Sequence, residues 1–415
     1  MRPERPHMHG RAAEDGGNEM RKTRILALLL ALLSAFPTGG TAQERQPLRT
    51  LDVDKTQGLR EAGIPTKNVL YDPWGDLGEL LQSGNAPDLL GFYTVNNELA
   101  PLYEAGLLAD LSENEEISQA VERMTRWARQ LVTTPDGQIF AMPVRHSVMP
   151  FCWNQDAWDA AGLAEEDAPR SYTELLDFLE RWCGRVEQSP EKDICVSALR
   201  TWNAGAEKYH YCWWLMEMLL DCWELQCRYA GEKVVFDTPE FAELSARTVE
   251  TALRLYKAEP SERKRQKMKE LFTNGLRGGS GFGMEEGLSH AVPMRITSGQ
   301  PMLVKADALL WCVRSGSAWY TEAAEFIAHS LESYGKQDVC TVYGDFPAGT
   351  YGPATVTQKW LDDYRAYEGE LVYFASVFYQ SQNSETDKES LMMKLFQGKI
   401  SAEAFARMLD ELLAN

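Results

Sequence analysis

The sequence lacks the short motifs that mark common catalytic centres. It contains no HExxH, no GxSxG and no Walker phosphate-binding loop. Its 6 histidines are scattered and show no metal-ligand spacing. Carboxylates are numerous, but no pair stands out as the two acids of a glycoside hydrolase. The sequence therefore predicts a protein that is not an enzyme and needs no metal and no cofactor. A secreted hydrolase is kept as a third hypothesis.

Cysteines are few and restricted to one part of the chain. All 8 lie between Cys152 and Cys340, and none shows the CxxC spacing of a zinc site. Cys183 and Cys195 are the easiest local pair to imagine as a disulfide in an exported protein, and buried thiols are the alternative. No cysteine follows the apolar segment near the start, so we expect no lipoprotein anchor there.

One apolar run near the start, residues 25–36, is too short to span a bilayer. Basic residues precede it, and a proline and small residues follow it, which is the layout of a secretory signal. We expect a signal peptide over residues 20–42 that is cleaved before Gln43, with residues 1–19 as an extension or a mis-start. An uncleaved anchor is the alternative. The predicted location is extracellular or periplasmic, associated with the cell envelope.

Positive charge is scarce. Lys and Arg number 42 against 61 Asp and Glu, which gives a net charge of −19. Such a surface repels phosphate backbones. The basic cluster at residues 262–269 has a helical pattern, and we interpret it as a solvated helix face. Nucleic acid is therefore excluded as a partner.

Short apolar runs alternate with amphipathic segments along the chain. This order is typical of an α/β protein with mainly parallel sheets. Strands are predicted at residues 67–72, 86–93 and 138–144, and helices at residues 74–84 and 96–106. Further helix starts carry capping residues, namely Ser171 with Glu174, Asp237 with Glu240, and Ser401.

Two aromatic residues follow the predicted strand that contains Leu89 and Leu90. In open parallel sheets, ligands bind beyond the carboxyl ends of the strands. Phe92 and Tyr93 would then face a ligand crevice, or else cap the edge of the core.

The segment 201–214 combines several aromatic residues with polar ones. An aromatic ring suits the C–H face of a sugar, while polar neighbours bind its hydroxyls. Trp202 and Tyr209 are open as contacts of this kind. Trp213 and Trp214 are better interpreted as the start of a buried helix, because the residues around them are apolar.

Seven motifs follow one another over residues 80–415. They are LLQSGNAPDLL, LAPLYEAGLLADLS, PDGQIFAMPVRHSVMPFCWNQDAWDAAGL, SYTELLDF, VVFDTPEFAEL, SAWYTEAAEFIAHSLES and FQGKISAEAFARMLDELL. In this order they resemble the extracellular solute-binding proteins of ABC importers, in the family-1 group that is dominated by sugar binders. No single motif is decisive, but their conjunction is specific.

The resemblance implies a periplasmic-binding-protein-like fold of two α/β lobes, joined by crossing hinge strands, with ligand held in the inter-lobe cleft. Lobe 1 would comprise residues 46–144 and 295–367, and lobe 2 residues 145–294 and 368–415. The implied function is the capture of a small-molecule ligand, a mono- or oligosaccharide, for delivery to ABC permease subunits by closure of the lobes.

The resemblance also implies ligand contacts. Phe92 falls where sugar-binding relatives place an aromatic residue, and Trp153 falls where a ring often stacks on ligand. Ser147 takes the place of a polar contact on the inter-lobe strand, with Arg145 and His146 beside it. Together with Tyr93 and Trp202, these residues form the predicted site.

Four other residues are expected to be structural. Asp88 and Asn154 belong to the family motifs but should cap turns, and Trp311 and Trp319 should lie in the core.

Two departures from the family pattern matter. The region between Gln43 and Pro87 is short for the two strands and two helices that relatives have there, and the anchor cysteine is missing. A second hypothesis therefore keeps the fold and makes the protein a sensory or partner-binding one without transport.

Overall fold

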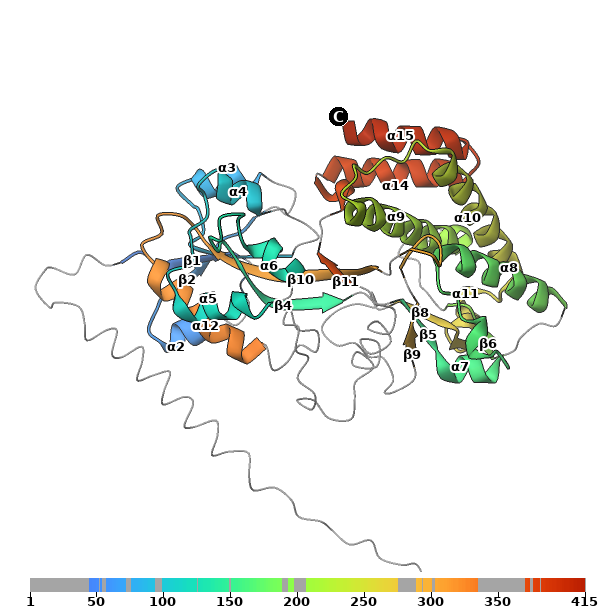
Figure 1. The fold of residues 1–415 in the computed structure, drawn as a ribbon, viewed down its shortest axis with the longest axis horizontal. Coiled ribbons are helices and arrows are strands. Elements are labelled where there is room, and N and C mark those ends of the chain that lie inside the picture. The colour runs from blue at the N-terminus through green and yellow to red at the C-terminus, as the bar shows by residue number, and fades with distance from the viewer. Residues whose placement is uncertain are drawn as a thin grey trace, which may run out of the picture.

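The fold is described from a computed structural model of the chain. Two bodies of helices and strands lie side by side, with strands running between them (Figure 1). The structure describes residues 45–51, 53, 57–71, 76–93, 99–124, 126–148, 151–188, 193–197, 207–274, 289–292, 294–300, 303–334, 370–373, 376–380 and 382–414.

A six-stranded sheet forms the centre of the first body. Its order is β11-β10-β3-β1-β2, and β4 also pairs with β10. The pairs β1–β2, β1–β3 and β10–β11 are parallel, whereas β10 runs antiparallel to both β3 and β4. The sheet is thus mixed, where mainly parallel pairing was predicted. Its strands are β1 (Leu48–Leu51), β2 (Thr66–Asn68), β3 (Leu89–Tyr93), β4 (Met142–Val148), β10 (Leu303–Val313) and β11 (Glu370–Tyr373).

Helices cover both faces of this sheet, with α3 and α4 on one side and α2, α5 and α12 on the other (Figure 1). Leu89 and Leu90 are fully buried, as predicted for a strand covered on both faces. On β10, Trp311 stacks on Phe326 of α12 with the ring centroids 5.2 Å apart. The helices are α2 (Gln57–Glu61), α3 (Leu77–Gln82), α4 (Ala100–Glu104), α5 (Glu115–Glu122), α6 (Arg126–Val132) and α12 (Tyr320–Tyr334).

Asp88 joins three segments of the first body just before β3. It is only 4% exposed. One carboxylate oxygen accepts the backbone N–H of Arg49 at 2.9 Å, and the other accepts Nη2 of Arg314 at 3.1 Å and Oγ of Ser317 at 2.9 Å. These bonds tie the amino end of β3 to β1 and to the loop after β10, so the structural role predicted for Asp88 is confirmed.

Helices dominate the second body, which has its own hydrophobic core. There β5 is the middle strand of an antiparallel sheet with β8 and β9, and β6 pairs with β7. Aromatic rings fill much of this core, and Trp158 stacks on Phe178 with centroids 5.1 Å apart. The strands are β5 (Phe151–Asn154), β6 (Ile194–Cys195), β7 (Lys269–Glu270), β8 (Phe272–Asn274) and β9 (Ser289–Ala291). The helices are α7 (Gln155–Ala160), α8 (Tyr172–Gln188), α9 (His210–Ala230), α10 (Pro239–Ala258), α11 (Glu262–Arg265), α14 (Gln382–Phe396) and α15 (Ala402–Ala414), with short 3-10 helices η1 (Glu165–Asp167), η2 (Glu207–Tyr209) and η3 (Val377–Gln380).

Most of the predicted caps are confirmed, and one is displaced. Asn154 Oδ1 accepts the N–H of Ala157 at the start of α7, and the hydroxyls of Ser171 and Ser401 cap α8 and α15 in the same way. For α10 the prediction of Asp237 was wrong by one residue. Thr238 caps this helix, while the N–H of Asp237 donates to Asp410 on α15.

Several predictions concern cysteines and the N-terminal segment. Cys183 and Cys195 form no disulfide with each other, and burial raises the pKa of the Cys183 thiol to about 12. The alternative of buried thiols therefore holds for this pair. Cys340, the signal peptide at 20–42 and the extension at 1–19 lie outside the described residues. Within the described ranges, no helix has the length and apolar character needed to cross a membrane.

Candidate functional site

Along the residues that the structure describes, the chain passes between the two bodies three times. β4 ends at Val148 in the first sheet, and β5 begins at Phe151 in the second. Ile296 packs in the second core, after which β10 carries the chain back into the first sheet. From β11 the chain returns, so that Phe378 packs in the second core. Three crossings of this kind form a hinge region between two lobes.

Strand β10 brings four of the predicted site residues together. Leu309 pairs with Tyr93 of β3 on one side and with Arg145 of β4 on the other. His146 and Ser147, the next residues of β4, pair with the two β10 residues that precede Leu309. These positions lie at the carboxyl end of β3, where sequence analysis places the ligand crevice. Residues 94–98, which follow β3, lie outside the described part of the chain.

Phe92 and Trp153 both pack in hydrophobic cores. Phe92 is 5% exposed and belongs to the first core. Trp153 is 3% exposed, and its ring centroid lies 4.9 Å from that of Trp158 in the second core. Their direct contact with a ligand stays a prediction.

The tryptophans that were interpreted as core residues are confirmed as such. Trp214 lies in α9 and is buried, and the neighbouring Trp213 packs edge-on against Phe396 with centroids 5.3 Å apart. Trp311 and Trp319 are buried in the first core. Trp202 lies outside the described residues.

Tyr209 is the other aromatic residue of segment 201–214 that is open as a ligand contact. It is half-buried against the second core, where its ring stacks on that of Phe396 with centroids 6.2 Å apart. The ammonium of Lys208 lies 5.1 Å from the centre of the tyrosine ring. Its ring therefore has packing partners within the second body.

Glu224 is a residue at the third crossing that sequence analysis did not single out. It lies on α9 and is 1% exposed. Its carboxylate accepts the Ser376 hydroxyl at 2.9 Å and the Val377 N–H at 2.8 Å, and Arg228 lies 3.3 Å away. Burial raises the pKa of Glu224, while Arg228 and these bonds lower it. Glu224 is one of three acids on α9, together with Glu217 and Asp221, so the sequence alone does not single it out.

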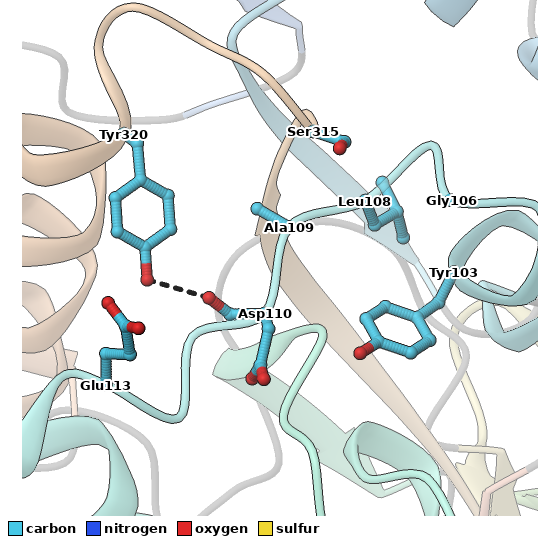
Figure 2. Close-up of a pocket in the computed structure, with 8 residues that line it drawn as sticks. All are labelled: Tyr103, Gly106, Leu108, Ala109, Asp110, Glu113, Ser315 and Tyr320. Atoms are coloured by element: carbon cyan, nitrogen blue, oxygen red, sulfur yellow. Dashed lines mark hydrogen bonds between the residues drawn. The ribbon is translucent and has the colours of Figure 1, made fainter.

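A pocket of about 420 Å³ opens at the other end of the first sheet (Figure 2). Val313 of β10 pairs with Leu89, the first residue of β3, and the pocket residues Ser315 and Tyr320 follow β10. The pocket therefore lies at the amino end of β3, opposite Tyr93. Its lining includes Tyr103, Leu108, Asp110, Glu113, Ser315 and Tyr320.

Among the described residues, no cluster of three or more His, Cys, Asp or Glu side chains is placed to hold a metal ion.

Two lobes joined by three crossings define a two-lobe solute-binding protein. The family model of bacterial extracellular solute-binding proteins matches residues 68–275, which is half of the chain. The chain belongs to this family. No curated protein sequence matches it.

Solved structures of substrate-binding proteins share the fold at low sequence identity. An ABC substrate-binding protein from Listeria monocytogenes in complex with cycloalternan has a TM-score of 0.57 at 13% identity, over 88% of this chain and 96% of that one. The cyclic alpha-maltosyl-1,6-maltose binding protein from Arthrobacter globiformis has a TM-score of 0.55 at 15% identity, over 89% and 99%. The binding protein RafE in complex with raffinose has a TM-score of 0.57 at 14% identity, over 89% and 99%.

Proposed function

We propose that this solute-binding protein captures a carbohydrate between its lobes and delivers it to the permease of an ABC transporter. The observation that carries the proposal is the hinge region, where β10 holds Tyr93 on one side and Arg145 on the other. Both positions lie in the first sheet, next to the point where the chain crosses from β4 to β5, so a ligand placed there lies beside the junction of the lobes. It shifts the lobes towards closure by as much as it prefers the closed state. The sugars named for the similar structures support a carbohydrate as the ligand.

The proposed ligand contacts fall into two groups. Four lie along the two edges of β10, and the others come from the cores and from outside the described residues. In full they are Tyr93, Arg145, His146, Ser147, Phe92, Trp153 and Trp202. We expect the first four to dominate, because Phe92 and Trp153 are almost fully buried.

The lobe boundaries belong to the same proposal. Lobe 1 comprises residues 46–144 and 295–367, and lobe 2 residues 145–294 and 368–415. Support comes from the two separate hydrophobic cores, which fall largely on these segments. The crossings themselves lie slightly later than these bounds. Ile296 still packs in the second core. The first sheet includes β4 up to Val148, and it also includes β11 at Glu370–Tyr373.

Export completes the proposal. The family is extracellular, and we propose that the signal peptide at 20–42 is cleaved before Gln43 and that no lipid is attached. Mass spectrometry of the exported protein tests this, because cleavage leaves Gln43 as the first residue. A mature chain that retains residues 20–42 contradicts it.

The ligand is tested by thermal unfolding of the chain from Gln43 with a panel of mono- and oligosaccharides. At a hundredfold excess over the dissociation constant, a bound sugar stabilises the folded state by about 2.7 kcal/mol and raises the melting temperature. Small-angle scattering of the same samples should show a smaller radius of gyration as the lobes close. Arg145→Ala should reduce the shift, whereas the exposed Arg407→Ala serves as the matched control.

A panel without any shift overturns the carbohydrate proposal. If the scattering curve is also unchanged by every ligand, the partner-binding hypothesis replaces capture. A shift that Arg145→Ala leaves intact keeps capture and removes Arg145 from the site.

A further inference from the structure

The pocket at the far end of lobe 1 differs in chemistry from the hinge region. Figure 2 shows two tyrosine rings, Tyr103 and Tyr320, on either side of the Asp110 carboxylate, with the Glu113 carboxylate near Tyr320. None of the described residues that line it is basic. A volume of about 420 Å³ is within the range of small-molecule sites.

The backbone holds this arrangement in place. The Tyr320 hydroxyl donates to the backbone carbonyl of Asp110 at 2.7 Å, which links α12 to the loop after α4. Tyr103 donates to Gln138 at 2.6 Å. Oδ1 of Asp110 accepts the N–H of Ser112 at 2.9 Å. The side chains of Tyr103, Tyr320 and Asp110 are therefore preorganised, and a ligand would not have to order them.

The pKa values of both tyrosines are raised, in part by the negative charges around the pocket. Burial raises the pKa of Tyr320, and the charges of Glu113 and Asp110 raise it further. For Tyr103 the same holds, with burial first and Asp110 next. On α12, the pKa of Glu325 is also raised, first by burial and then by the charges of Glu322 and Glu116. This end of lobe 1 therefore favours a positive charge.

A guanidinium group already occupies the neighbouring surface. Arg45 forms an ion pair with Glu322, and its guanidinium carbon lies 4.2 Å from the centre of the Trp319 ring. Trp319 and Glu322 flank Tyr320 in sequence, so the same combination of ring and carboxylate recurs beside the pocket. Aromatic rings and carboxylates together bind cations through the ring face and through charge.

We propose that this pocket is a second binding site, separate from the sugar crevice, for a guanidinium or primary ammonium group. The group enters between the rings of Tyr103 and Tyr320 and pairs with the carboxylates of Asp110 and Glu113. Its source is a free cationic small molecule or an arginine or lysine side chain of another protein. The pocket lies at the opposite end of β3 from Tyr93, so binding here is independent of carbohydrate capture.

The test is calorimetric titration of the chain from Gln43 with three probes at low ionic strength. Nα-acetyl-arginine amide represents a protein side chain, and agmatine represents a free cation. Nα-acetyl-citrulline amide has nearly the same shape without the charge. We expect both cations to bind and the citrulline compound to bind at least tenfold more weakly. Binding should also weaken in 0.15 M salt, where screening acts over about 8 Å.

Glu113→Gln is the informative variant, because Glu113 is exposed and its loss does not threaten the fold. It should weaken cation binding about three- to fivefold, as expected for one exposed ion pair. Glu240→Gln makes the same charge change on an exposed residue of α10 and should leave binding unchanged. Tyr103→Leu should weaken binding further by removing one ring.

Three results overturn the proposal. The first is no heat from either cation up to about 10 mM, and the second is equal binding of the citrulline compound. The third is an equal loss of affinity in Glu113→Gln and Glu240→Gln, which assigns the effect to net charge alone. Sugar binding measured on the same variants is expected to be unchanged, so failure here is distinguishable from failure of carbohydrate capture. Stronger binding of the acetylated arginine than of agmatine identifies a protein side chain as the source, and the reverse identifies a free cation.

Discussion

His210, the first residue of α9, is bonded at both ring nitrogens inside lobe 2. It is only 4% exposed. Nδ1 lies 2.7 Å from the carbonyl oxygen of Glu207, and Nε2 lies 3.0 Å from Nη2 of Arg265. Because arginine only donates, Nε2 must accept and the ring proton must be on Nδ1. Burial lowers the pKa of His210 to about 4, with a further lowering by Arg265 that the bond to Glu207 opposes.

Acid should therefore destabilise lobe 2 through this residue. The pKa of His210 in the folded state, about 4, lies below the ordinary value of 6.5. Neutral His210 therefore makes its full contribution to the free energy of unfolding above pH 6.5, and this contribution is lost as the pH falls towards 4. The difference corresponds to about 3 kcal/mol, at about 1.36 kcal/mol for each pKa unit. His210→Gln keeps one donor and one acceptor but does not titrate. Its free energy of unfolding should fall about 3 kcal/mol less than that of the wild type between pH 7 and pH 4.

Glu259, which shares the neighbour Arg265 with His210, changes the pH dependence of stability in the opposite direction. It accepts Nε1 of Trp182 at 2.8 Å, and burial raises its pKa to about 7. Since this folded pKa lies above the ordinary 4.5, its contribution is present below pH 4.5 and is lost as the pH rises through 7. Glu259→Gln should therefore make the acid loss steeper than in the wild type, while His210→Gln makes it shallower.

Urea unfolding between pH 4 and pH 8, followed by tryptophan fluorescence, measures these free energies. Lobe 2 carries the buried Trp153, Trp158 and Trp182, so its transition dominates the signal. Curves for wild type and His210→Gln that run parallel from pH 7 to pH 4 would refute the reasoning. A proton NMR titration that places the His210 pKa near 6.5 would refute it directly.

Three further predictions concern single residues. Asp88→Asn leaves the partly buried charges of Arg49 and Arg314 without their anion and should lower the free energy of unfolding of lobe 1 by about 2 kcal/mol, as measured in urea. Asn154→Ala removes the cap of α7 and should cost about 1 kcal/mol in the same assay. The thiol of Cys183 should react with a disulfide reagent only after unfolding, and fast reaction of the native protein at pH 8 would contradict its burial.

The elements of lobe 1 that depend on local pattern could be predicted from the sequence. The apolar run that ends at Leu90 is a buried strand, and the alternation of apolar runs with amphipathic segments gives the α/β class. The strand predicted at 138–144 is displaced and runs from Met142 to Val148. Pro143 and the polar residues after it give this segment no strand-like hydrophobic pattern. The strand forms because it pairs with β10.

The contacts that depend on distant segments could not be predicted. The pocket needs Asp110 and Tyr320 side by side, and they meet only because β10 runs antiparallel to β3. Glu224 reaches the third crossing through residues 376–377, far away in sequence. The displaced cap at Thr238 has another cause, because the N–H of Asp237 is drawn to Asp410 of a helix near the C-terminus.

The position of β10 in the middle of the first sheet governs the order in which the chain can fold. The edge of β3 (residues 89–93) that faces β10 can pair only after residues 309–313 of β10 have been synthesised. At the usual rate of synthesis, ~200 intervening residues represent a delay on the order of ten seconds or more. During this time that edge of β3 is unpaired, and a bare strand edge invites pairing with other chains. A binding factor that shields nascent β3 should therefore raise the yield of folded protein more than any stabilising change in lobe 2.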